Sequence, residues 1–330
     1  MRIIDFHNHF YPPAYIDALR AEPSGGVTVT TDARGNPVLH SPGDANIAVP
    51  PHRDVAARLT DLDAERIDMQ VLTFTTPGVH VHPPGRAVPY ARLVNDALTE
   101  IVRERGDRFT ALATLPLCDP AASVAELDRV MGDLGLPGCM VFGNVNGVAL
   151  SDPRFEPLYR RASERRAVFF IHPTHPLGVE AMTQWWLMPL VGFLFDTTLA
   201  AASLVFSGVV ERHPGIRWVL AHLGGAVPYL AERLDRGYRA FADCRAHISR
   251  PPSEYLREFY YDTVNFDPRA LRLAIDFAGV DRILAGSDFP HQIGSLRSMV
   301  ESVEGLGLAA ADREKVFGGN AARLLGLGAS

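Results

Sequence analysis

The side chains best suited to chemistry begin with two histidines near the N-terminus. His7 and His9 flank Asn8 at the end of an apolar run. Residues two apart in an extended strand point to the same side, so both imidazoles share one face. Neutral imidazole is a strong zinc ligand, with nitrogen–metal distances of ~2.0–2.1 Å. Two unrelated polar residues would show the same spacing, so the pair needs support from elsewhere in the chain.

Three further residues follow apolar runs in the same way. His172 ends the run VFFIH, His222 ends WVLAH, and Asp288 follows RILAGS. Barrels of alternating strands and helices place their catalytic groups at the carboxyl ends of the strands. The joint pattern therefore favours one catalytic or metal site over unrelated polar residues. His222 could serve there as an acid or base near neutral pH, the alternative being a satisfied core histidine.

The elements that must position these groups alternate between short apolar runs and stretches of helical periodicity. The eight candidate strands are residues 2–5, 69–74, 109–114, 138–142, 168–172, 218–222, 259–262 and 282–286. The candidate helices between them include residues 54–66, 89–104, 121–134, 155–166, 227–241 and 268–278. Such alternation predicts an α/β fold with parallel strands. Eight units, with no GxGxxG after any strand, favour a (β/α)8 TIM barrel over a doubly wound sheet.

Two segments do not fit a bare barrel. Residues 21–52 are rich in Gly, Pro, Thr and Asn and predict a loop or small β-hairpin inserted after the first strand. Loops that follow strands face the active site in barrels, so we expect the insertion to cover or line the pocket. Residues 312–327 predict a C-terminal helical cap. Because no tandem repeat or linker interrupts the chain, we expect a single domain over residues 1–330.

Composition narrows the possible partners. The chain is 47% hydrophobic and 21% charged with a net charge of −6, which excludes a disordered, collagenous or disulfide-scaffold protein. The chain has no long run of like-charged residues that would indicate binding to nucleic acid or to an anionic membrane, so a small molecule is the expected partner. Lys315 is the only lysine. A P-loop lysine, a Schiff-base lysine and a carbamylated lysine bridging two metals are therefore excluded.

Sequence features also bear on where the protein resides. The N-terminus lacks the apolar stretch of a signal peptide. The cysteines, at 118, 139 and 244, are odd in number and widely spaced, which suits a reducing cytoplasm. The apolar stretch 188–210 is long enough to span a bilayer, but Asp196, Thr197, Thr198 and Ser203 lie near its middle. We interpret it as a buried or interface helix.

The motifs IDFHNHF, FFIHP, VLAHLGGAVPYLAERLD, FYYDT and GSDFP occur in this order and spacing. In this combination the chain resembles the amidohydrolase superfamily, and within it the metal-dependent decarboxylases typified by aminocarboxymuconate-semialdehyde decarboxylase. The similarity runs nearly end to end. It implies a distorted (β/α)8 barrel that holds one divalent metal ion, usually zinc and sometimes manganese.

The resemblance also implies roles for individual residues. His7, His9, His172 and Asp288 match the metal ligands, and His222 matches the histidine that hydrogen-bonds the metal-bound water. We therefore assign His222 and Asp288 as catalytic. The lack of a lysine after the fourth strand favours a mononuclear site.

Arg233 matches an arginine that reaches across a dimer interface to a substrate carboxylate, the alternative being an exposed helix arginine. The second such arginine would fall at Phe241, where this chain departs from the pattern, and Arg239 is a possible substitute. A homodimer is expected from the resemblance and from the apolar helix.

Other departures concern the pocket. His175 and His291 stand where the semialdehyde decarboxylases have aspartate and phenylalanine, and either imidazole could bind a phenolic or carboxylate oxygen. Trp186 could supply an aromatic wall, although tryptophans of this kind are more often in a core or interface. His80 and His82 form a second HxH pair, which we interpret as loop histidines because no carboxylate accompanies them.

Together these features predict non-oxidative decarboxylation of an aromatic or enoic carboxylic acid with a neighbouring hydroxyl, carbonyl or amine. A metal-dependent hydrolase or hydratase acting on a lactone, amide or double bond is the alternative, because the ligands alone suit either reaction.

Overall fold

The computed structural model describes residues 1–41 and 44–328, and its centre is a set of parallel strands. They are β1 (Ile4–His9), β5 (Met69–Thr73), β6 (Phe109–Ala111), β7 (Ala113–Thr114), β8 (Gly138–Phe142), β11 (Val168–His172), β12 (Arg217–Leu220), β13 (Tyr260–Asp262) and β14 (Ile283–Leu284). Hydrogen bonding follows the orders β1-β5-β6 and β7-β8-β11-β12-β13-β14. β6 and β7 form one interrupted strand, because Leu112 between them donates its N–H to the Leu72 carbonyl at 3.0 Å.

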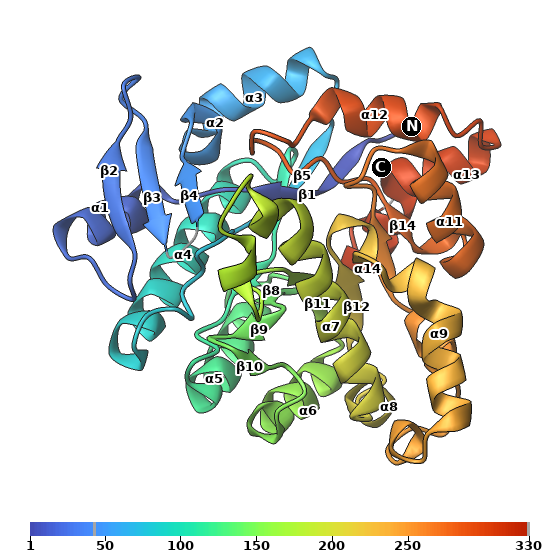
Figure 1. Cartoon of the computed structure of the whole chain (residues 1–330). Helices are drawn as coiled ribbons and strands as arrows, with labels where there is room; N and C mark the ends of the chain where they lie inside the picture. The colour runs from blue at the N-terminus through green and yellow to red at the C-terminus, as the bar shows by residue number, and fades with distance from the viewer. Residues whose placement is uncertain (42–43, 329–330) are drawn as a thin grey trace.

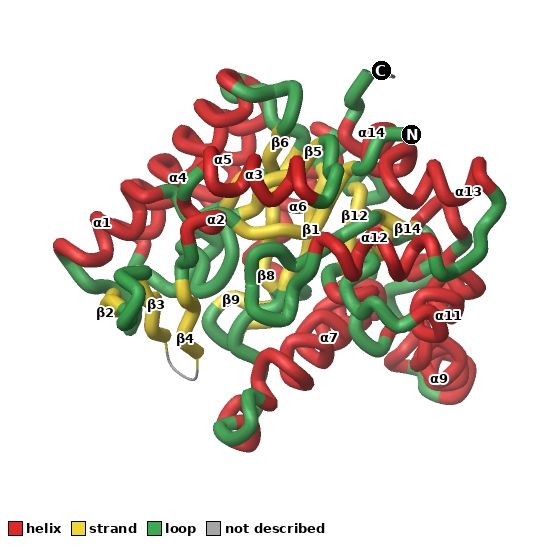
Figure 2. Tube along the Cα trace, turned by 90° about the horizontal axis from the view of Figure 1, so that it is seen from above, coloured by secondary structure: helices red, strands yellow, loops and turns green. Residues whose placement is uncertain are grey.

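Hydrogen bonds also bring the first strand beside the last. The Phe6 N–H donates to the Ala285 carbonyl and the His9 N–H to the Phe289 carbonyl, both at 2.8 Å. The strands therefore form eight positions around an axis, with helices outside them (Figure 2). The predicted distorted (β/α)8 barrel is confirmed. The first strand begins two residues later than expected and runs through His9.

The outer helices match the periodic segments closely. They are α3 (Val55–Ala64), α4 (Pro84–Glu104), α5 (Pro120–Gly132), α6 (Glu156–Arg165), α7 (Phe193–Phe206), α9 (Val227–Ala240), α11 (Pro268–Ala278) and α12 (Leu296–Glu304). Asp54, Asp119 and Asp267 cap α3, α5 and α11 by accepting backbone N–H bonds in the first turn. α4 begins five residues before the predicted start, because Pro84 opens the helix and Pro89 is tolerated inside it.

Shorter elements complete the chain. They are β9 (Asn144–Val145), β10 (Val148–Ala149), α8 (Val209–Arg212), α10 (Pro252–Leu256), η1 (Pro153–Phe155), η2 (Val179–Met182), η4 (His222–Gly224), η5 (Asp243–Arg245) and η6 (Val280–Arg282).

The predicted insertion is a small antiparallel sheet rather than a loop or a two-stranded hairpin. α1 (Pro13–Ala21) precedes it, and β2 (Thr28–Thr31), β3 (Pro37–Ser41) and β4 (Asp44–Ile47) pair in that order. Figure 1 shows this sheet in blue at one side of the barrel. It leads into α2 (Pro50–Arg53), whose His52 is buried and lies beside His291 of the site. The insertion therefore lines the pocket, as expected.

The predicted C-terminal cap closes the other end of the barrel. It consists of α13 (Ala310–Glu314), the wider turn η7 (Lys315–Gly319) and α14 (Asn320–Leu325). Ala321 and Leu324 pack in one apolar cluster with Ile4, Met69 and Val168, which are first residues of their strands. The cap thus covers the amino ends of the strands, where α14 packs against β1.

Among the described residues, one helix meets the length and composition expected of a membrane span. This helix, Met188–Phe206, is made of η3 (Met188–Gly192) and α7. It has 19 residues, and 44% of its apolar stretch is buried inside the protein. A core helix of a soluble protein passes the same test, so this is weak evidence for a membrane. Asp196 of this helix is buried and bonds Asn144 and the Thr174 N–H, which agrees with the interpretation as a packed helix.

Candidate metal centre and active site

A bulge in β1 aims the first two candidate ligands into the barrel. The pairing of β1 with β5 shifts register between Asp5 and Asn8. Phe6 packs in the interior against Phe170, and His7 also faces inward, with its ring 5.1 Å from that of Phe170. A β-bulge of this kind adds one residue to a strand and redirects side chains, often next to active sites. His7 and His9 therefore share the inner face, as their spacing predicts, while Asp5 and Asn8 point outward.

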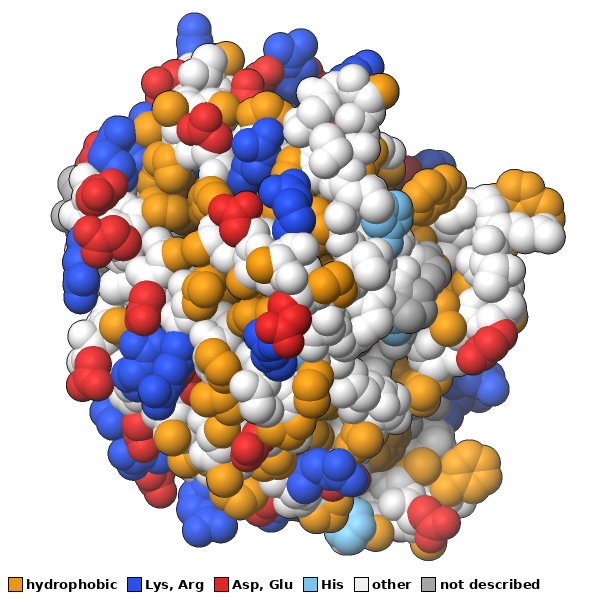
Figure 3. All heavy atoms as spheres, turned by 90° about the vertical axis from the view of Figure 1, so that its left-hand side faces the viewer, with side chains coloured by type: hydrophobic (Ala, Val, Ile, Leu, Met, Phe, Trp, Pro, Cys, Tyr) orange, Lys and Arg blue, Asp and Glu red, His pale blue; other side chains and the backbone are white. Residues whose placement is uncertain are grey.

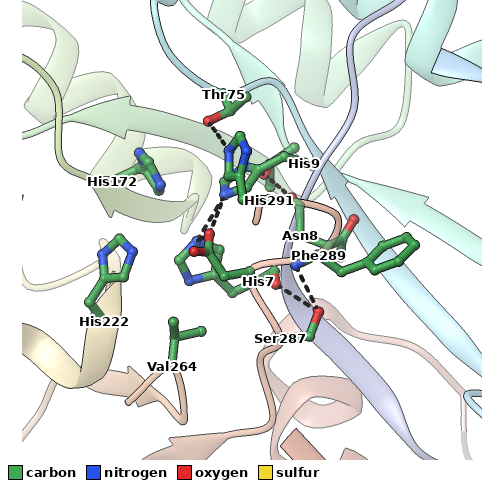
Figure 4. A network of polar contacts seen from close by, with 12 residues as sticks. His7, Asn8, His9, Thr75, His172, His222, Val264, Ser287, Phe289 and His291 are labelled. Carbon is green, nitrogen blue, oxygen red and sulfur yellow. Dashed lines mark hydrogen bonds and ion pairs between the residues drawn. The ribbon is translucent and has the colours of Figure 1, made fainter. Parts of the chain in front are cut away.

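Four buried side chains converge at the carboxyl ends of the strands. His7, His9, His172 and Asp288 each offer one ligand atom, and these atoms all lie within 4.8 Å of one another. The His7 Nε2 and His9 Nε2 atoms are 3.1 Å apart, and Asp288 Oδ1 lies 2.9 Å from His9 Nε2. Two tetrahedral ligands of one zinc ion, each at ~2.0–2.1 Å, are separated by roughly 3.3 Å. The donor set and its spacing therefore fit one divalent ion. Figure 4 shows the three histidines of the set turned toward one another.

Asp262 orients His7, a role that the sequence did not indicate. Its Oδ2 accepts the His7 Nδ1–H at 2.5 Å, which leaves the Nε2 lone pair of His7 pointing at the cluster. A carboxylate behind a ligating histidine fixes its tautomer and increases its basicity. Asp262 ends β13, so the strand-end rule that found His172 and His222 could also have found it.

His172 is oriented by the backbone instead. Its Nδ1 donates to the Pro173 carbonyl at 2.8 Å, so its Nε2 is the nitrogen available to an ion. The ring lies 4.9 Å from that of His9 and 5.3 Å from that of His7, nearly perpendicular to both. Each imidazole thus presents one nitrogen to the same point.

The protonation preferences of the cluster also suit a cation. Burial lowers the pKa of His9 and His172 well below the usual range, helped by the neighbouring histidines, so both rings stay neutral. Burial also disfavours the protonated form of His7. The carboxylates of Asp262 and Asp288 together have the larger effect, so the pKa of His7 is raised. Metal ligands must be neutral imidazoles and ionised carboxylates. A divalent ion would supply the positive charge that the carboxylates attract.

His222 lies beside the ligands without belonging to their set. Its ring is 5.0 Å from His7 and 5.5 Å from His172, and Figure 4 shows it on the His172 side of the cluster. Its Nδ1 is buried with no hydrogen-bond partner among the described residues. Burial and the nearby His7 lower the pKa of His222 to about 4, so the imidazole is neutral at neutral pH. The neutral ring can therefore donate or accept a proton beside the ligands.

Backbone strain accompanies two of these residues. His222 and Asp288 have φ of 54° and 58°, in the left-handed region that non-glycine residues rarely adopt. Asp262 compensates at His222, because it accepts the N–H groups of His222 at 3.0 Å and Leu223 at 2.8 Å. At Asp288 the N–H donates to the His7 carbonyl at 2.8 Å. Strain held by surrounding bonds is typical of functional sites.

Behind β1, a buried network connects the ligand-bearing segments. Arg58 of α3 is fully buried and donates to Asn8 Oδ1 at 2.9 Å, to Gln70 Oε1 at 2.7 Å, and to the His9 carbonyl. Gln70 donates to Asp5 at 2.7 Å, and Asp5 accepts from the Ser287 hydroxyl at 2.6 Å. The network therefore joins the histidine strand to the residue before Asp288. No sequence signal marked Arg58 for this role.

A second pair of histidines covers the cluster. His291 packs its ring 4.6 Å from His9, and its Nδ1 lies 3.3 Å from Nε2 of His52, which the inserted segment supplies. Thr75 Oγ1 lies 3.5 Å from Nε2 of His291. His291 is thus placed at the site, as its position in the sequence suggested, and His52 is a further residue of the site that the sequence did not indicate. Figure 4 shows His291 and His222 on different sides of His7.

The remaining predicted residues lie farther out. His175 is half-buried and lines a cavity with His80 and Thr174. Trp186 is 61% exposed, and Arg233 is exposed on α9, so their substrate roles stay predictions. Arg239 pairs with Glu232 at 2.8 Å. His82 bonds Tyr15, and among the described residues neither it nor His80 belongs to a metal-type cluster.

Surface charges give no single-sign patch on the face seen in Figure 3. Acidic and basic side chains alternate there with apolar ones.

Comparisons with known proteins add to this geometry. The profile of the Amidohydrolase family matches residues 4–327. A 2-amino-3-carboxymuconate-6-semialdehyde decarboxylase from Dictyostelium discoideum is 34% identical over 279 residues, 83% of this chain and 77% of that protein.

Two solved structures share the whole fold. A 5-carboxyvanillate decarboxylase from Sphingomonas paucimobilis is 26% identical with a TM-score of 0.88, covering 99% of this chain and 100% of that one. A dihydroxybenzoic acid decarboxylase from Polaromonas sp. JS666, with bound manganese and the inhibitor 2-nitroresorcinol, is 26% identical with a TM-score of 0.84. That match covers 100% of this chain and 98% of the other.

Proposed function

The chain belongs to the amidohydrolase family and is one of its metal-dependent decarboxylases, and we propose that its substrate is an aromatic acid with a hydroxyl group beside the carboxyl group. The observation that carries this proposal is the buried cluster of His7, His9, His172 and Asp288 with the unpartnered His222 beside it. A single domain over residues 1–330 accounts for the site, because its ligands come from both ends of the chain.

We assign the metal to His7, His9, His172 and Asp288, with Zn²⁺ as the resident ion and Mn²⁺ as the alternative. Three imidazole nitrogens and one carboxylate suit zinc, a borderline ion. The manganese in the dihydroxybenzoic acid decarboxylase supports the alternative. When bound, the ion supplies positive charge that attracts a carboxylate and an adjacent phenolic oxygen. Metal analysis of the purified protein distinguishes the two ions.

His222 is the group that handles the proton. Decarboxylation needs a proton at the ring carbon that bears the carboxyl group, after which the carbon–carbon bond breaks and CO2 leaves. The neutral imidazole of His222, whose Nδ1 has no hydrogen-bond partner among the described residues, can carry such a proton. It lies beside the metal ligands at the carboxyl ends of the strands. Asp288 is catalytic through its place in the ligand set. His175, His291 and Trp186 are proposed to contact the substrate.

We further propose that the enzyme is a homodimer in which each subunit contributes to binding the substrate of its neighbour. Exposed apolar side chains on η3 and α7 include Leu190, Phe195 and Leu199, and α9, which packs against α7, adds Tyr229. A large exposed apolar patch is typical of an interface. Arg233 is exposed on α9, where it can reach a neighbouring subunit's substrate carboxylate. Light scattering tests the dimer, and replacing Phe195 with Asp should give a monomer.

We also place the enzyme in the cytoplasm. All three cysteines, Cys118, Cys139 and Cys244, are free, as in proteins of reducing compartments.

Product analysis tests the reaction. Metal-loaded protein is incubated with ortho-hydroxybenzoic acids, lactones and amides, and the products are followed by NMR. Release of CO2, with a proton in place of the carboxyl group, is expected. Replacing His222 with Asn should lower turnover roughly 10²–10⁴-fold with metal content unchanged. Water added to a lactone, amide or alkene without CO2 would instead support hydrolysis or hydration, and full turnover in the variant would refute the role of His222.

A further inference from the structure

A buried histidine of the inserted segment contacts the histidine that covers the metal cluster. His52 of α2 is 1% exposed, and its Nε2 lies 3.3 Å from Nδ1 of His291. The two rings are 5.0 Å apart, centroid to centroid, and the Tyr11 ring packs 5.5 Å from that of His52. His291 in turn lies 4.6 Å from the ring of His9. The insertion therefore reaches a metal ligand through one intervening side chain.

The contact between His52 and His291 joins two neutral rings. Burial lowers the pKa of both histidines, and the positive charge of Arg58 acts in the same direction on each. Each neutral imidazole carries one N–H and one bare nitrogen. A hydrogen bond between them therefore needs a proton on one of the two facing nitrogens and none on the other.

Two arrangements of protons satisfy this contact. In the first, His52 Nε2–H donates to His291 Nδ1, and the proton of His291 is on Nε2. In the second, His291 Nδ1–H donates to His52 Nε2, and the proton of His52 is on its own Nδ1. The choice of donor thus fixes the tautomer of both rings.

The surroundings of His52 Nδ1 favour the first arrangement. This atom is buried and has no hydrogen-bond partner among the described residues. The second arrangement would place an N–H there, and buried N–H groups without an acceptor are rarer in proteins than acceptors without a donor. The first arrangement leaves a bare nitrogen there, and it puts both rings in the Nε2–H form that a neutral histidine side chain prefers. His52 is therefore the donor.

The proton of His291 then lies on Nε2, at the active-site end of the barrel. Thr75 Oγ1 is 3.5 Å from this nitrogen, at the outer limit of a hydrogen bond, so it holds the N–H only weakly (Figure 4). His291 is partly exposed, whereas the four metal ligands are buried. The N–H of His291 can therefore turn to an acceptor atom of a molecule bound at the cluster.

We propose that His52 is a positioning residue for His291: it donates to His291 Nδ1 and so presents the Nε2–H of His291 to an oxygen atom of the substrate. The substrate part of this inference rests on the proposed decarboxylase function. It narrows recognition at His291 to an acceptor oxygen, such as that of a phenolate or a carboxylate, because a ring with its proton on Nε2 offers no lone pair there.

Neutron diffraction tests the proton positions, because X-ray structures at ordinary resolution do not show hydrogens. Crystals of the zinc-loaded protein are exchanged into D2O. We expect deuterium on Nε2 of His52 and on Nε2 of His291, with none on either Nδ1. Deuterium on His291 Nδ1 would overturn the proposal, whichever nitrogen of His52 carries its own.

Calorimetric titration with 2-nitrophenol tests the donor without turnover, because this probe has acceptor oxygens and no carboxyl group to lose. His52→Leu removes the donor, and the dissociation constant of the zinc-loaded protein should rise about 5–10-fold, the loss expected for one hydrogen bond. His52→Gln should restore most of the affinity, because its amide can donate to His291 Nδ1. His40→Leu is the matched control and should bind as the parent does, because His40 belongs to the same inserted sheet but contacts Thr30.

A double-mutant cycle shows whether His52 acts through His291. In the His291→Phe protein, which lacks the N–H, His52→Leu should change the dissociation constant by no more than about twofold. Equal losses in both backgrounds, or a loss in His52→Gln as large as that in His52→Leu, would overturn the positioning role. None of these measurements needs release of CO2, so a failure of the proposed function would appear only in the product analysis.

Discussion

The buried guanidinium of Arg58 allows a sharp prediction, because it holds the strand that carries two ligands. Its Nε donates to the Pro51 carbonyl at 2.9 Å, and its terminal nitrogens bond Asn8, Gln70 and the His9 carbonyl. The perturbation is Arg58→Met, which keeps an unbranched apolar stem and removes every donor together with the guanidinium group. All four acceptors then lose the bond that Arg58 donates.

The expected loss of stability follows from these contacts. Each buried acceptor left unpaired destabilises the fold by about 1–3 kcal/mol. Small movements of neighbouring groups relieve part of this loss, so the losses for the four acceptors do not simply add. Removing one partner of a buried charge network typically costs about 3–5 kcal/mol. Asp5, whose pKa burial raises to about 6, would also lose the nearby positive charge of Arg58. We expect the free energy of unfolding to fall by about 3–5 kcal/mol.

The assay measures stability and metal binding separately. Urea unfolding of the metal-free protein gives the loss of stability, and equilibrium binding of Mn²⁺ gives the effect on the ligands. We expect the dissociation constant to rise by about 10–100-fold, as for residues that orient metal ligands. Arg108→Met is the control, because Arg108 also bonds two carbonyls, of Ile67 and Asp68, and pairs with Asp63, but it is only half-buried, so water can replace these bonds. It should cost no more than about 1 kcal/mol.

The result that would refute this reasoning is an Arg58→Met protein with the unfolding midpoint and Mn²⁺ affinity of the parent. If Arg58→Met does not fold, Arg58→Lys serves instead. A lysine keeps the charge but cannot reproduce the planar set of five donors, so an intermediate loss in both measurements is expected.

Two further predictions concern protons and metal. Burial raises the pKa of Asp196 in the folded protein from 3.8 to about 6. As pH rises from about 4 to about 6, Asp196 therefore ionises in the unfolded chain before it ionises in the folded one, and the free energy of unfolding falls by roughly 3 kcal/mol. Asp196→Asn should remove this part of the slope in urea unfolding at stepped pH, and an unchanged slope would contradict it. Zinc at 100 times its dissociation constant should stabilise the protein by about 2.7 kcal/mol. In thermal unfolding this shift should vanish with chelator or in His172→Ala, and persistence in that variant would exclude His172 as a ligand.

Strand ends were the most productive signal in the sequence. The apolar runs before His172, His222 and Asp288 predicted where these residues lie, because a buried parallel strand needs continuous apolar side chains and ends at the active face. The HxH spacing predicted a shared face for His7 and His9, which β1 shows. The bulge that turns both Phe6 and His7 inward could not be predicted from the sequence, because it depends on how β1 pairs with β5.

The missing parts of the site depend on contacts between distant segments. Asp262 approaches His7 across 255 positions of the chain, and Arg58 approaches Asn8 across 50. A single sequence records neither distance. His52 was hidden for a different reason: it lies in the insertion, whose alternating pieces predicted strands but not the side on which they would pack.

The ligand set includes residues of both the first and the last strand regions, and this has a consequence for biosynthesis. His9 and Asp288 are 279 positions apart yet 2.9 Å from each other. A nascent chain emerging at ~5–20 residues per second exposes its histidine pair long before Asp288 leaves the ribosome. Products truncated before that point lack both the carboxylate ligand and the segment that bonds the first strand. Full-affinity metal uptake therefore requires that synthesis has passed Asp288.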